Sequence, residues 1–451
     1  MTVTNEIKEA TEKEEIQDDV FTVKEEEPKE DDEKLLALKA KLAKKGGKMP
    51  PRIVQEKKRS LNFGVLCSGQ GGSKLGQAFH QLGYKTLIIN TTNQDLQFIN
   101  VPDSNKILLE YGIGGSAKDR SVGRTAAELN QDKIFEQISL QFEDCPIIFI
   151  CSSLGGGSGS GSLDVLVDLC NKTGKPVIVC GILPLSSDDA QCKRNSLEAL
   201  ASLTKDIQNK KIANLIVIDN AKLEAIYSDV NQLDFFDVSN KKIIEVLEVF
   251  NTYSSMPSSV KPLDPMEFSK LILNGGGLSI YGSQEVYNYQ EDETAIAEAA
   301  IDSDSCMLGS GFNISEAAFV GVLFLANKNV WAKIPSSAIN YAISIINEQC
   351  SGAESVFRGI YSTDDPEDCV KIYTFYSGLN LPNSRIEQLK SESAELDKKI
   401  KEKQTARNLS LKLEFNKDES ITAAEKIREK IAKKRSPLEQ MMAATIDKRK
   451  K

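Results

Sequence analysis

The residues of this sequence whose types and spacing best suit the binding of a phosphate form a glycine-rich segment at 155–161. It reads GGGSGSG and lies between the apolar run 146–151 and the periodic run 163–169, an order that predicts strand, loop and helix. A helix that begins in such a loop presents unpaired N–H groups and the positive end of its dipole, and both favour a phosphate. Glycines let the backbone approach the anion, and serine hydroxyls add donors. The candidate contacts are Gly155, Gly156, Gly157, Ser158, Gly159, Ser160 and Gly161.

Other interpretations of this loop fit less well. A flexible linker has a similar composition, but a linker rarely lies between a buried strand and a periodic helix. A Walker-type P-loop requires a lysine directly after its last glycine, and Ser162 stands there instead. The dinucleotide fingerprint usually opens the first strand-helix unit of its domain, whereas this loop comes about ninety residues into the expected ordered region.

A second strand-glycine-helix turn opens the ordered region. After a strand expected at 61–67 the chain reads GQGGSKLG, where the candidate contacts are Gly69, Gln70, Gly71, Gly72 and Ser73. Alone, such a turn is weak evidence, because many dinucleotide-binding domains begin in the same way. An NAD-dependent oxidoreductase would also need an acid near the end of the second strand, where Asn90 and two threonines stand. That enzyme class is therefore the least favoured alternative.

The composition of the 451 residues predicts a soluble, cytoplasmic protein of two or three domains. No apolar run reaches the roughly 18 residues that a membrane-spanning helix needs. The nine cysteines are scattered without a CxxC pair, which indicates buried thiols and not disulfides or zinc ligands. His80 is the single histidine, which argues against histidine triads and multi-histidine metal sites, and no set of metal ligands is predicted.

Charge is concentrated at the two ends of the chain. Residues 1–33 carry about ten more acids than bases, residues 34–58 about eight more bases than acids, and residues 384–451 about seven more bases than acids. Such blocks are typical of solvated, disordered or singly helical segments, and sometimes of interaction arms. We expect a disordered arm at 1–58 and a charged helical or disordered tail at 384–451.

Strands and helices alternate between these ends. Strands are expected at 61–67, 85–90, 106–109, 147–151, 175–183 and 212–219. The alternation predicts an α/β fold with a doubly wound parallel sheet, which binds ligands at the carboxyl ends of its strands. A long helix is expected after Asn240, and residues 262–268 begin another. A smaller α+β second domain is predicted from strands at 320–326, 355–361 and 370–376 with a helix at 338–348.

Several motifs, in order along the chain, resemble those of the tubulin/FtsZ superfamily. GGGSGSG agrees at all seven positions with the signature GGG[T/S]G[T/S]G, and GQGGSKLG is similar to the GQxGxxxG turn of tubulins. The stretch NTTNQDL resembles the NTxxQxL loop of FtsZ and of plasmid and phage tubulins, with Thr92 at the usual FtsZ aspartate. Residues 111–117 and 122–128 resemble the γ-phosphate loop and the VGRxAAE helix start. These details favour the plasmid and phage branch over cell-division FtsZ.

The resemblance implies a polymerising GTPase that binds GTP or GDP with Mg²⁺. Further contacts implied are Asn90, Gly114, Gly115, Ser116, Arg194, Asn220 and Asn240, of which the last two would read the guanine edge. The acids of the NxDxxD loop correspond to Asp264 and Glu267, which would complete the active site of the next subunit in a head-to-tail homopolymer. Pro262 replaces the usual asparagine of that loop, and two acids at this spacing also form an ordinary helix start.

The implied domains follow the same order. They are a charged arm at 1–58, a nucleotide-binding domain at 59–240, a central helix and catalytic loop at 241–274, a small activation domain at 275–383 and a tail at 384–451. The favoured function is a filament-forming GTPase that positions or segregates DNA or phage, and the alternative is a catalytically weak nucleotide-binding scaffold or adaptor. No evident base lies beside the phosphate loops, so one subunit alone should hydrolyse GTP slowly. The basic tail is expected to contact an acidic partner, either an adaptor or DNA-linked partner or the acidic N-terminal arm of a neighbouring subunit.

Overall fold

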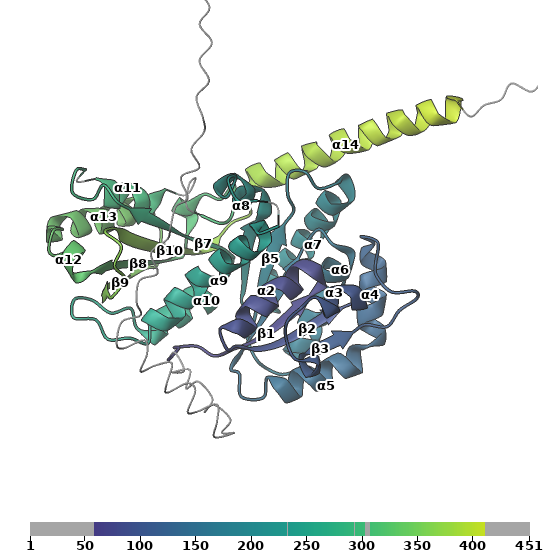
Figure 1. The fold of residues 1–451 in the computed structure, drawn as a ribbon, viewed down its shortest axis with the longest axis horizontal. Helices are drawn as coiled ribbons and strands as arrows, with labels where there is room; N and C mark the ends of the chain where they lie inside the picture. The colour runs from purple at the N-terminus through teal and green to yellow at the C-terminus, as the bar shows by residue number, and fades with distance from the viewer. Residues whose placement is uncertain (1–57, 232, 293, 303–306, 411–451) are drawn as a thin grey trace, which may run out of the picture. The chain divides into compact units, whose positions relative to one another are not determined.

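The computed structural model describes residues 58–231, 233–292, 294–302 and 307–410. These residues form one compact unit around a ten-stranded sheet with the strand order β3-β2-β1-β4-β5-β6-β7-β10-β8-β9 (Figure 1). The strands of the predicted nucleotide-binding domain and of the predicted small domain therefore belong to one sheet.

The first six strands are parallel and form one half of the sheet. They are β1 (Phe63–Ser68), β2 (Lys85–Asn90), β3 (Lys106–Leu108), β4 (Ile147–Ser153), β5 (Val177–Leu183) and β6 (Asn214–Asp219). In the register of the sheet, Leu66 of β1 lies between Leu87 of β2 and Ile150 of β4. Every residue of β1, β5 and β6 is buried, which explains why these strands are largely continuous apolar runs in the sequence.

Helices cover both faces of the parallel half. They are α2 (Gly69–Gln81), α3 (Asn93–Gln97), α4 (Arg120–Leu129), α5 (Gln131–Gln141), α6 (Gly157–Asn171), α7 (Ala190–Gln208), α8 (Asn220–Ile226) and α9 (Phe235–Tyr253), with a 3₁₀ turn at Asp103–Asn105. The next helix, α10 (Pro265–Leu273), packs on strands of the other half of the sheet. Leu66 belongs to a core cluster with Leu163 of α6. The next residue, Cys67, belongs to a second cluster with Phe79 of α2 and Phe250 of α9. Because successive strand residues face opposite sides, the sheet is doubly wound, as predicted.

The second half of the sheet is mixed. It contains β7 (Leu278–Val286), β8 (Phe319–Asn327), β9 (Ser355–Thr363) and β10 (Val370–Leu379), with α11 (Ala295–Ile301), α12 (Lys328–Trp331), α13 (Ser336–Gln349) and a 3₁₀ turn at Ile314–Glu316. β7 pairs in parallel with β6 and antiparallel with β10, so it joins the two halves. The predicted strands β8, β9 and β10 and the predicted helix α13 are present, whereas the sequence does not predict β7 and α11.

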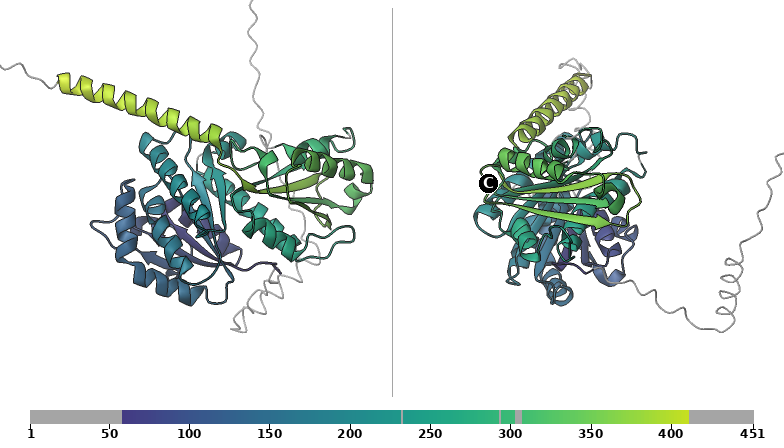
Figure 2. Two further views of the ribbon diagram at one scale, coloured as in Figure 1. Left: turned by 180° about the vertical axis from the view of Figure 1, so that it is seen from behind. Right: turned by 90° about the vertical axis from the view of Figure 1, so that its left-hand side faces the viewer.

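Two helices differ from the sequence-based expectation. Helix α9 begins at Phe235, so Asn240 lies inside it and not before it. The tail begins with α14 (Asn383–Ser410), whose first turns pack on α7 and bury Leu389 completely. Figure 2 shows α14 lying against the body at its start and extending beyond it. The start of the tail is thus part of the folded unit, whereas 411–451 and most of the predicted arm lie outside the described residues.

The described chain also tests two expectations from composition. Its eight cysteines are free and buried, as predicted. None of its helices combines the length and the apolar character needed to cross a membrane.

Candidate functional site

The loops that follow the six parallel strands, β1 to β6, meet at the carboxyl edge of these strands and surround a cavity of about 500 Å³. This is the edge at which doubly wound sheets bind ligands. The predicted contacts that line it are Gly69, Gln70, Gly71, Asn90, Gly115, Ser116, Gly155, Gly156, Gly157, Ser158, Gly159, Asn220 and Asn240. The lining residues that were not predicted are Lys74, Thr92, Asp95, Ala117, Lys118, Ser153, Ile182, Pro184, Leu185, Asp188, Cys192 and Phe236.

Two uncapped helix N-termini contribute to one end of this cavity. Helix α2 begins at Gly69 and α6 at Gly157, and neither has a side chain that caps its first N–H groups. By contrast, Asp219 caps α8 beside the same cavity. Unpaired N–H groups at the positive end of a helix dipole attract anions, so this end suits the phosphates of a ligand.

Gly69 and Gly159 bring the two glycine loops together. Gly69 has a φ of +72°, and a Cβ placed on it would lie 2.8 Å from the backbone nitrogen of Gly159. A Cβ on Gly159 would lie 2.6 Å from Oγ of Ser152 and 3.0 Å from the carbonyl oxygen of Ser68. Neither position has room for a side chain, so these glycines are needed for the contact between loops as well as for the approach of a ligand.

Three hydroxyl groups from three loops form a row beside the cavity. Oγ1 of Thr91 and Oγ of Ser158 are 2.5 Å apart, and Ser158 donates to Oγ of Ser116 at 2.9 Å. The N–H of Gly115 donates to the carbonyl of Thr91 at 2.9 Å. Each hydroxyl can donate and accept, so a phosphate oxygen entering here could exchange with one of these bonds.

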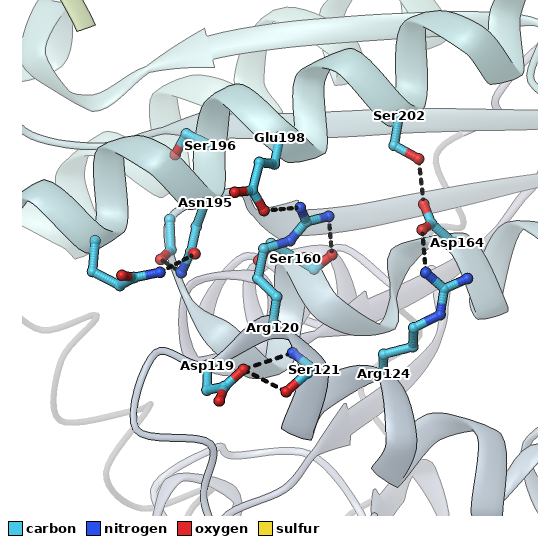
Figure 3. Close-up of polar contacts among 12 residues, drawn as sticks. Asp119, Arg120, Ser121, Arg124, Ser160, Asp164, Asn195, Ser196, Glu198 and Ser202 are labelled. Atoms are coloured by element: carbon cyan, nitrogen blue, oxygen red, sulfur yellow. Dashed lines mark hydrogen bonds and ion pairs between the residues drawn. The ribbon is translucent and has the colours of Figure 1, made fainter. Parts of the chain in front are cut away.

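Polar contacts from α4 and α7 hold the first turns of α6 (Figure 3). Arg120 of α4 donates from Nη2 to the carbonyl of Ser160 at 3.3 Å and from Nη1 to Glu198 of α7 at 2.9 Å. One turn further along α6, Asp164 accepts a bond from Arg124 at 3.3 Å. Arg120 and Arg124, the second of which belongs to the VGRxAAE motif, therefore fix the helix that carries the phosphate loop.

Asn195 of α7 joins two of the ligand loops. Its side-chain nitrogen donates to the carbonyls of Lys118 at 2.8 Å and Gly155 at 2.9 Å, and the residue is only 1% exposed. Nε2 of Gln191 donates to its Oδ1 at 2.8 Å, which fixes the orientation of the amide. Nothing in the sequence singled out this residue, because its partners are backbone atoms of loops distant in the chain.

The other end of the cavity is formed by α2, α8 and α9. Asn220 opens α8 and Asn240 lies in α9, and within the described ranges neither side-chain amide has a hydrogen-bond partner. Phe236 precedes Asn240 by about one turn, and the ammonium of Lys74 lies 5.1 Å from the centre of its ring. A flat ring and two free amides suit a base with donors and acceptors on its edge.

Several predicted contacts do not line the cavity, namely Gly72, Ser73, Gly114, Ser160, Gly161 and Arg194. A Cβ on Gly72 would lie 2.5 Å from the carbonyl oxygen of Cys151, and one on Gly161 would lie 2.2 Å from that of Arg120. The hydroxyls of Ser73 and Ser160 donate to carbonyls four residues earlier. Part of the glycine signature therefore reflects close packing of helices.

Arg194 differs most from the expectation that it lies near the nucleotide. Its Nη1 donates to both carboxylate oxygens of Asp397 at 2.6 Å, which places the side chain between α7 and α14. It faces the tail helix because the start of α14 packs on α7 and is not solvated on all sides, as its charge would predict.

Asp264 and Glu267 lie at the start of α10 and not at the cavity. Oδ1 of Asp264 accepts from the N–H of Glu267 at 2.8 Å, and Oε2 of Glu267 accepts from the N–H of Asp264 at 2.9 Å. Together they form a capping box, with Pro265 at the first helical position. The helix-start interpretation is therefore correct for the single chain.

The charged side chains in the cavity lining are Lys74, Lys118, Asp95 and Asp188. The hydrogen bond with Asp189 raises the pKa of Lys118, which keeps this group an ammonium. Asp95 accepts from Asn90 at 3.1 Å, and Asp188 accepts from a backbone N–H at 2.9 Å. Within the described part of the chain no cluster of three or more His, Cys, Asp or Glu side chains could hold a metal ion.

Comparison with known proteins agrees with this geometry. Residues 62–228 match the Tubulin/FtsZ family, GTPase domain. The chain contains a tubulin/FtsZ GTPase domain. Over 365 residues it is 25% identical to the tubulin-like protein TubZ of Bacillus cereus, covering 72% of this chain and 80% of the relative. Over 326 residues it is 25% identical to the tubulin-like protein CetZ of Pyrococcus furiosus, covering 70% and 84%.

Solved structures share the fold of this GTPase. A GTPγS-form protofilament of TubZ from Bacillus thuringiensis serovar israelensis has a TM-score of 0.69 at 21% identity, with 78% of this chain and 96% of that chain covered. CetZ2 from Haloferax volcanii, a GTPγS-bound protofilament, has a TM-score of 0.61 at 19% identity, with 76% and 100% covered. The predicted fold and the predicted GTPase class are thus confirmed.

Proposed function

We propose that this GTPase polymerises head to tail and that each subunit completes the active site of its neighbour. The observation that carries the proposal is the separation of the nucleotide cavity from the acids of α10. The N–H of Leu263, next to Asp264, donates to the hydroxyl of Tyr361 at 2.8 Å, and that hydroxyl donates to the carbonyl of Tyr253 at 2.8 Å. Tyr253 ends α9, about 20 Å along the helix from Asn240 in the cavity.

A guanine nucleotide would lie in the cavity with its phosphates at one end and its base at the other. The N-termini of α2 and α6 would hold the phosphates, and Asn220 and Asn240 would bond the edge of the base beside the ring of Phe236. Lys118 would add positive charge near the phosphates. The carboxylates of the lining already accept bonds from the chain, so Mg²⁺ would be held chiefly by phosphate oxygens and water. The ion would neutralise charge that develops during phosphoryl transfer.

We infer that hydrolysis then needs acids besides Asp95 and Asp188 of the cavity lining, whose carboxylates already accept hydrogen bonds from the chain. The exposed Asp264 and partly exposed Glu267 are free to approach a second molecule while they cap α10. Acids brought to the γ-phosphate end by the next subunit could orient the attacking water, so assembly would control turnover. Relatives whose structures are described as protofilaments or filaments support this arrangement.

A nucleotide-dependent pelleting assay tests the proposal. GTP or GTPγS should cause sedimentation and visible filaments, whereas ATP and NAD should not, and phosphate release should rise steeply with protein concentration. Equal affinity for GTP and ATP in a calorimetric titration would contradict guanine recognition. Tight GTP binding without assembly or turnover would favour the scaffold or adaptor of the same fold, and binding of NAD alone would favour the oxidoreductase.

We also propose that the filament positions or segregates DNA through a partner that binds the basic end of the chain. The support is the basic excess of the tail and a similar structure described as a type III plasmid segregation TubZ, with a TM-score of 0.65 at 20% identity. Truncation after Ser410 leaves the docked first turns of α14 in place. The truncated chain should still pellet with GTP but lose salt-dependent recruitment of an adaptor or DNA. Unchanged recruitment at low salt would refute this role.

A further inference from the structure

Helix α14 reaches the wall of the nucleotide cavity through a buried ion pair. Nε of Arg385 donates to Oδ2 of Asp219 at 2.7 Å, and Nη2 donates to Oδ1 at 3.1 Å. The two side chains are 2% and 1% exposed. A bidentate, charge-assisted pair without solvent has a defined geometry, and removal of one partner leaves a buried charge uncompensated.

Asp219 connects this pair to the base end of the cavity. It is the last residue of β6, and its Oδ1 also accepts from the N–H of Ala221 at 3.2 Å, which caps α8. Asn220 lies between the two and lines the cavity. The carboxylate that Arg385 holds therefore fixes the backbone on which Asn220 is carried.

A second wall of the cavity is held by the same helix. Nη2 of Arg385 also lies 3.4 Å from the carbonyl oxygen of Pro184, a lining residue. Lys193 of α7, only 2% exposed, donates to the carbonyl of Ser186 at 2.9 Å and pairs with Glu392 of α14 at 2.9 Å. Helix α14 thus holds in place both the segment after β5 and the first residue of α8.

We propose that Arg385 is a positioning residue for nucleotide recognition, and that docking of α14 and binding of the nucleotide strengthen each other through it. The inference rests on the proposed guanine-nucleotide site. A nucleotide that forms hydrogen bonds with Asn220 stabilises the same position of Asn220 that the Arg385–Asp219 pair stabilises. Because such coupling between two binding events is reciprocal, each should strengthen the other. Release of α14 would therefore weaken GTP binding, and bound GTP would hold α14 in place.

Arg385→Gln tests the positioning role, with Asp397→Asn as the matched control. The control removes another α7–α14 ion pair, but one whose side chains are 39% and 35% exposed and which does not touch the cavity wall. Titration of the full chain below its assembly concentration should give GTP binding about tenfold weaker for Arg385→Gln. Its preference for GTP over ATP should fall as well, because Asn220 loses its fixed position. Arg385→Lys should recover part of the affinity, and Asp397→Asn should match the unaltered chain.

Hydrogen exchange distinguishes the positioning role of Arg385 from a purely structural one, because a purely structural role would not make the exchange of α14 depend on GTP. In the unaltered chain and in Asp397→Asn, GTP should slow exchange at residues 383–393, and this effect should disappear in Arg385→Gln. Equal GTP affinity and preference in Arg385→Gln would overturn the inference while the proposed function stands. So would GTP-independent exchange of α14 in the unaltered chain, a measurement that does not depend on a variant that folds. Failure of the unaltered chain to bind GTP would instead refute the proposed function itself.

Discussion

Replacing Glu267 by glutamine separates the two roles that this side chain can have. Among the described residues of the single chain, its carboxylate accepts one hydrogen bond, from the N–H of Asp264 at 2.9 Å. Glutamine can accept the same bond, because a capping box works with Glu or Gln. Only the interaction of the charge with the helix dipole is lost, about 0.3–1 kcal/mol, so the unfolding temperature should change by a few degrees at most.

The expected effect on catalysis is far larger. If the charge acts on GTP bound to the adjoining subunit, its loss should slow turnover in filaments by about 10²- to 10⁴-fold, or about 3–5 kcal/mol of barrier. The GTP affinity of unassembled subunits should not change, because α10 does not line the cavity.

Phosphate release per pelleted subunit is the decisive measurement. Asp132→Asn is a matched control, since Asp132 is an exposed acid in the first turn of α5. Turnover should survive in that control, and Glu267→Gln filaments should persist because GDP accumulates slowly. Parental turnover in Glu267→Gln filaments would refute the trans-acting role and leave the residue as a cap only.

Three further outcomes follow from the contacts around the cavity. Gly159→Ala should abolish GTP binding in a titration because its Cβ would lie 2.6 Å from a neighbouring hydroxyl oxygen, whereas Gly352→Ala, with open space around the added carbon, should bind normally. Asn195→Ala should cost about 1–3 kcal/mol in denaturant unfolding and weaken GTP binding, because it leaves buried loop carbonyls unpaired. Burial raises the pKa of Glu392, but the interactions with Lys193, Gln388 and Arg385 together outweigh burial and lower the pKa below the ordinary value of 4.5. The stability from these interactions is therefore complete above about pH 4.5 and is lost as the pH falls through the lower folded pKa. Below pH 4.5 the unaltered chain should lose stability more steeply than Glu392→Gln in acid unfolding.

The parallel half of the fold could be predicted because its local signals agree with its tertiary structure. Strands buried on both faces are continuous apolar runs, and each is bounded by a glycine loop or a turn. The strand β7 (Leu278–Val286) escaped because a glycine and a serine interrupt it and its end is polar. It becomes a strand by pairing with β10, which is about 90 residues away in the chain. The start of α9 was misplaced because Asp237, Ser239 and Asn240 are typical of helix caps, yet packing of Phe235 extends the helix beyond them.

The candidate site was predictable where ligand contacts are backbone atoms of a glycine motif. The motif could not distinguish glycines that face the cavity from glycines that admit a neighbouring helix, such as Gly161 against α4. It also could not reveal supports that depend on distant segments, since Asn195 and Arg385 act through loops far from them in sequence. Apolar residues such as Ile386 and Leu389 recur at heptad-like spacing in the basic tail, but over only two heptads, which is too short a pattern to predict that its first turns would be buried.

The separation between the cavity and α10 also decides what kind of assembly the site requires. A contact that brings Glu267 of one subunit to the nucleotide of another joins two different surfaces of the protein. A pair of subunits therefore still has one free cavity at one end and one free α10 at the other, and further subunits can add through the same contact. Two inactive variants should then complement each other. Gly159→Ala subunits lack GTP but keep their acids, and Glu267→Gln subunits bind GTP but lack the charge. Wherever an intact α10 meets a filled cavity, hydrolysis should return, so a mixture should release phosphate faster than either variant alone. A mixture as slow as Glu267→Gln alone, with both variants in the pellet, would mean that Glu267 does not act on the nucleotide of its neighbour.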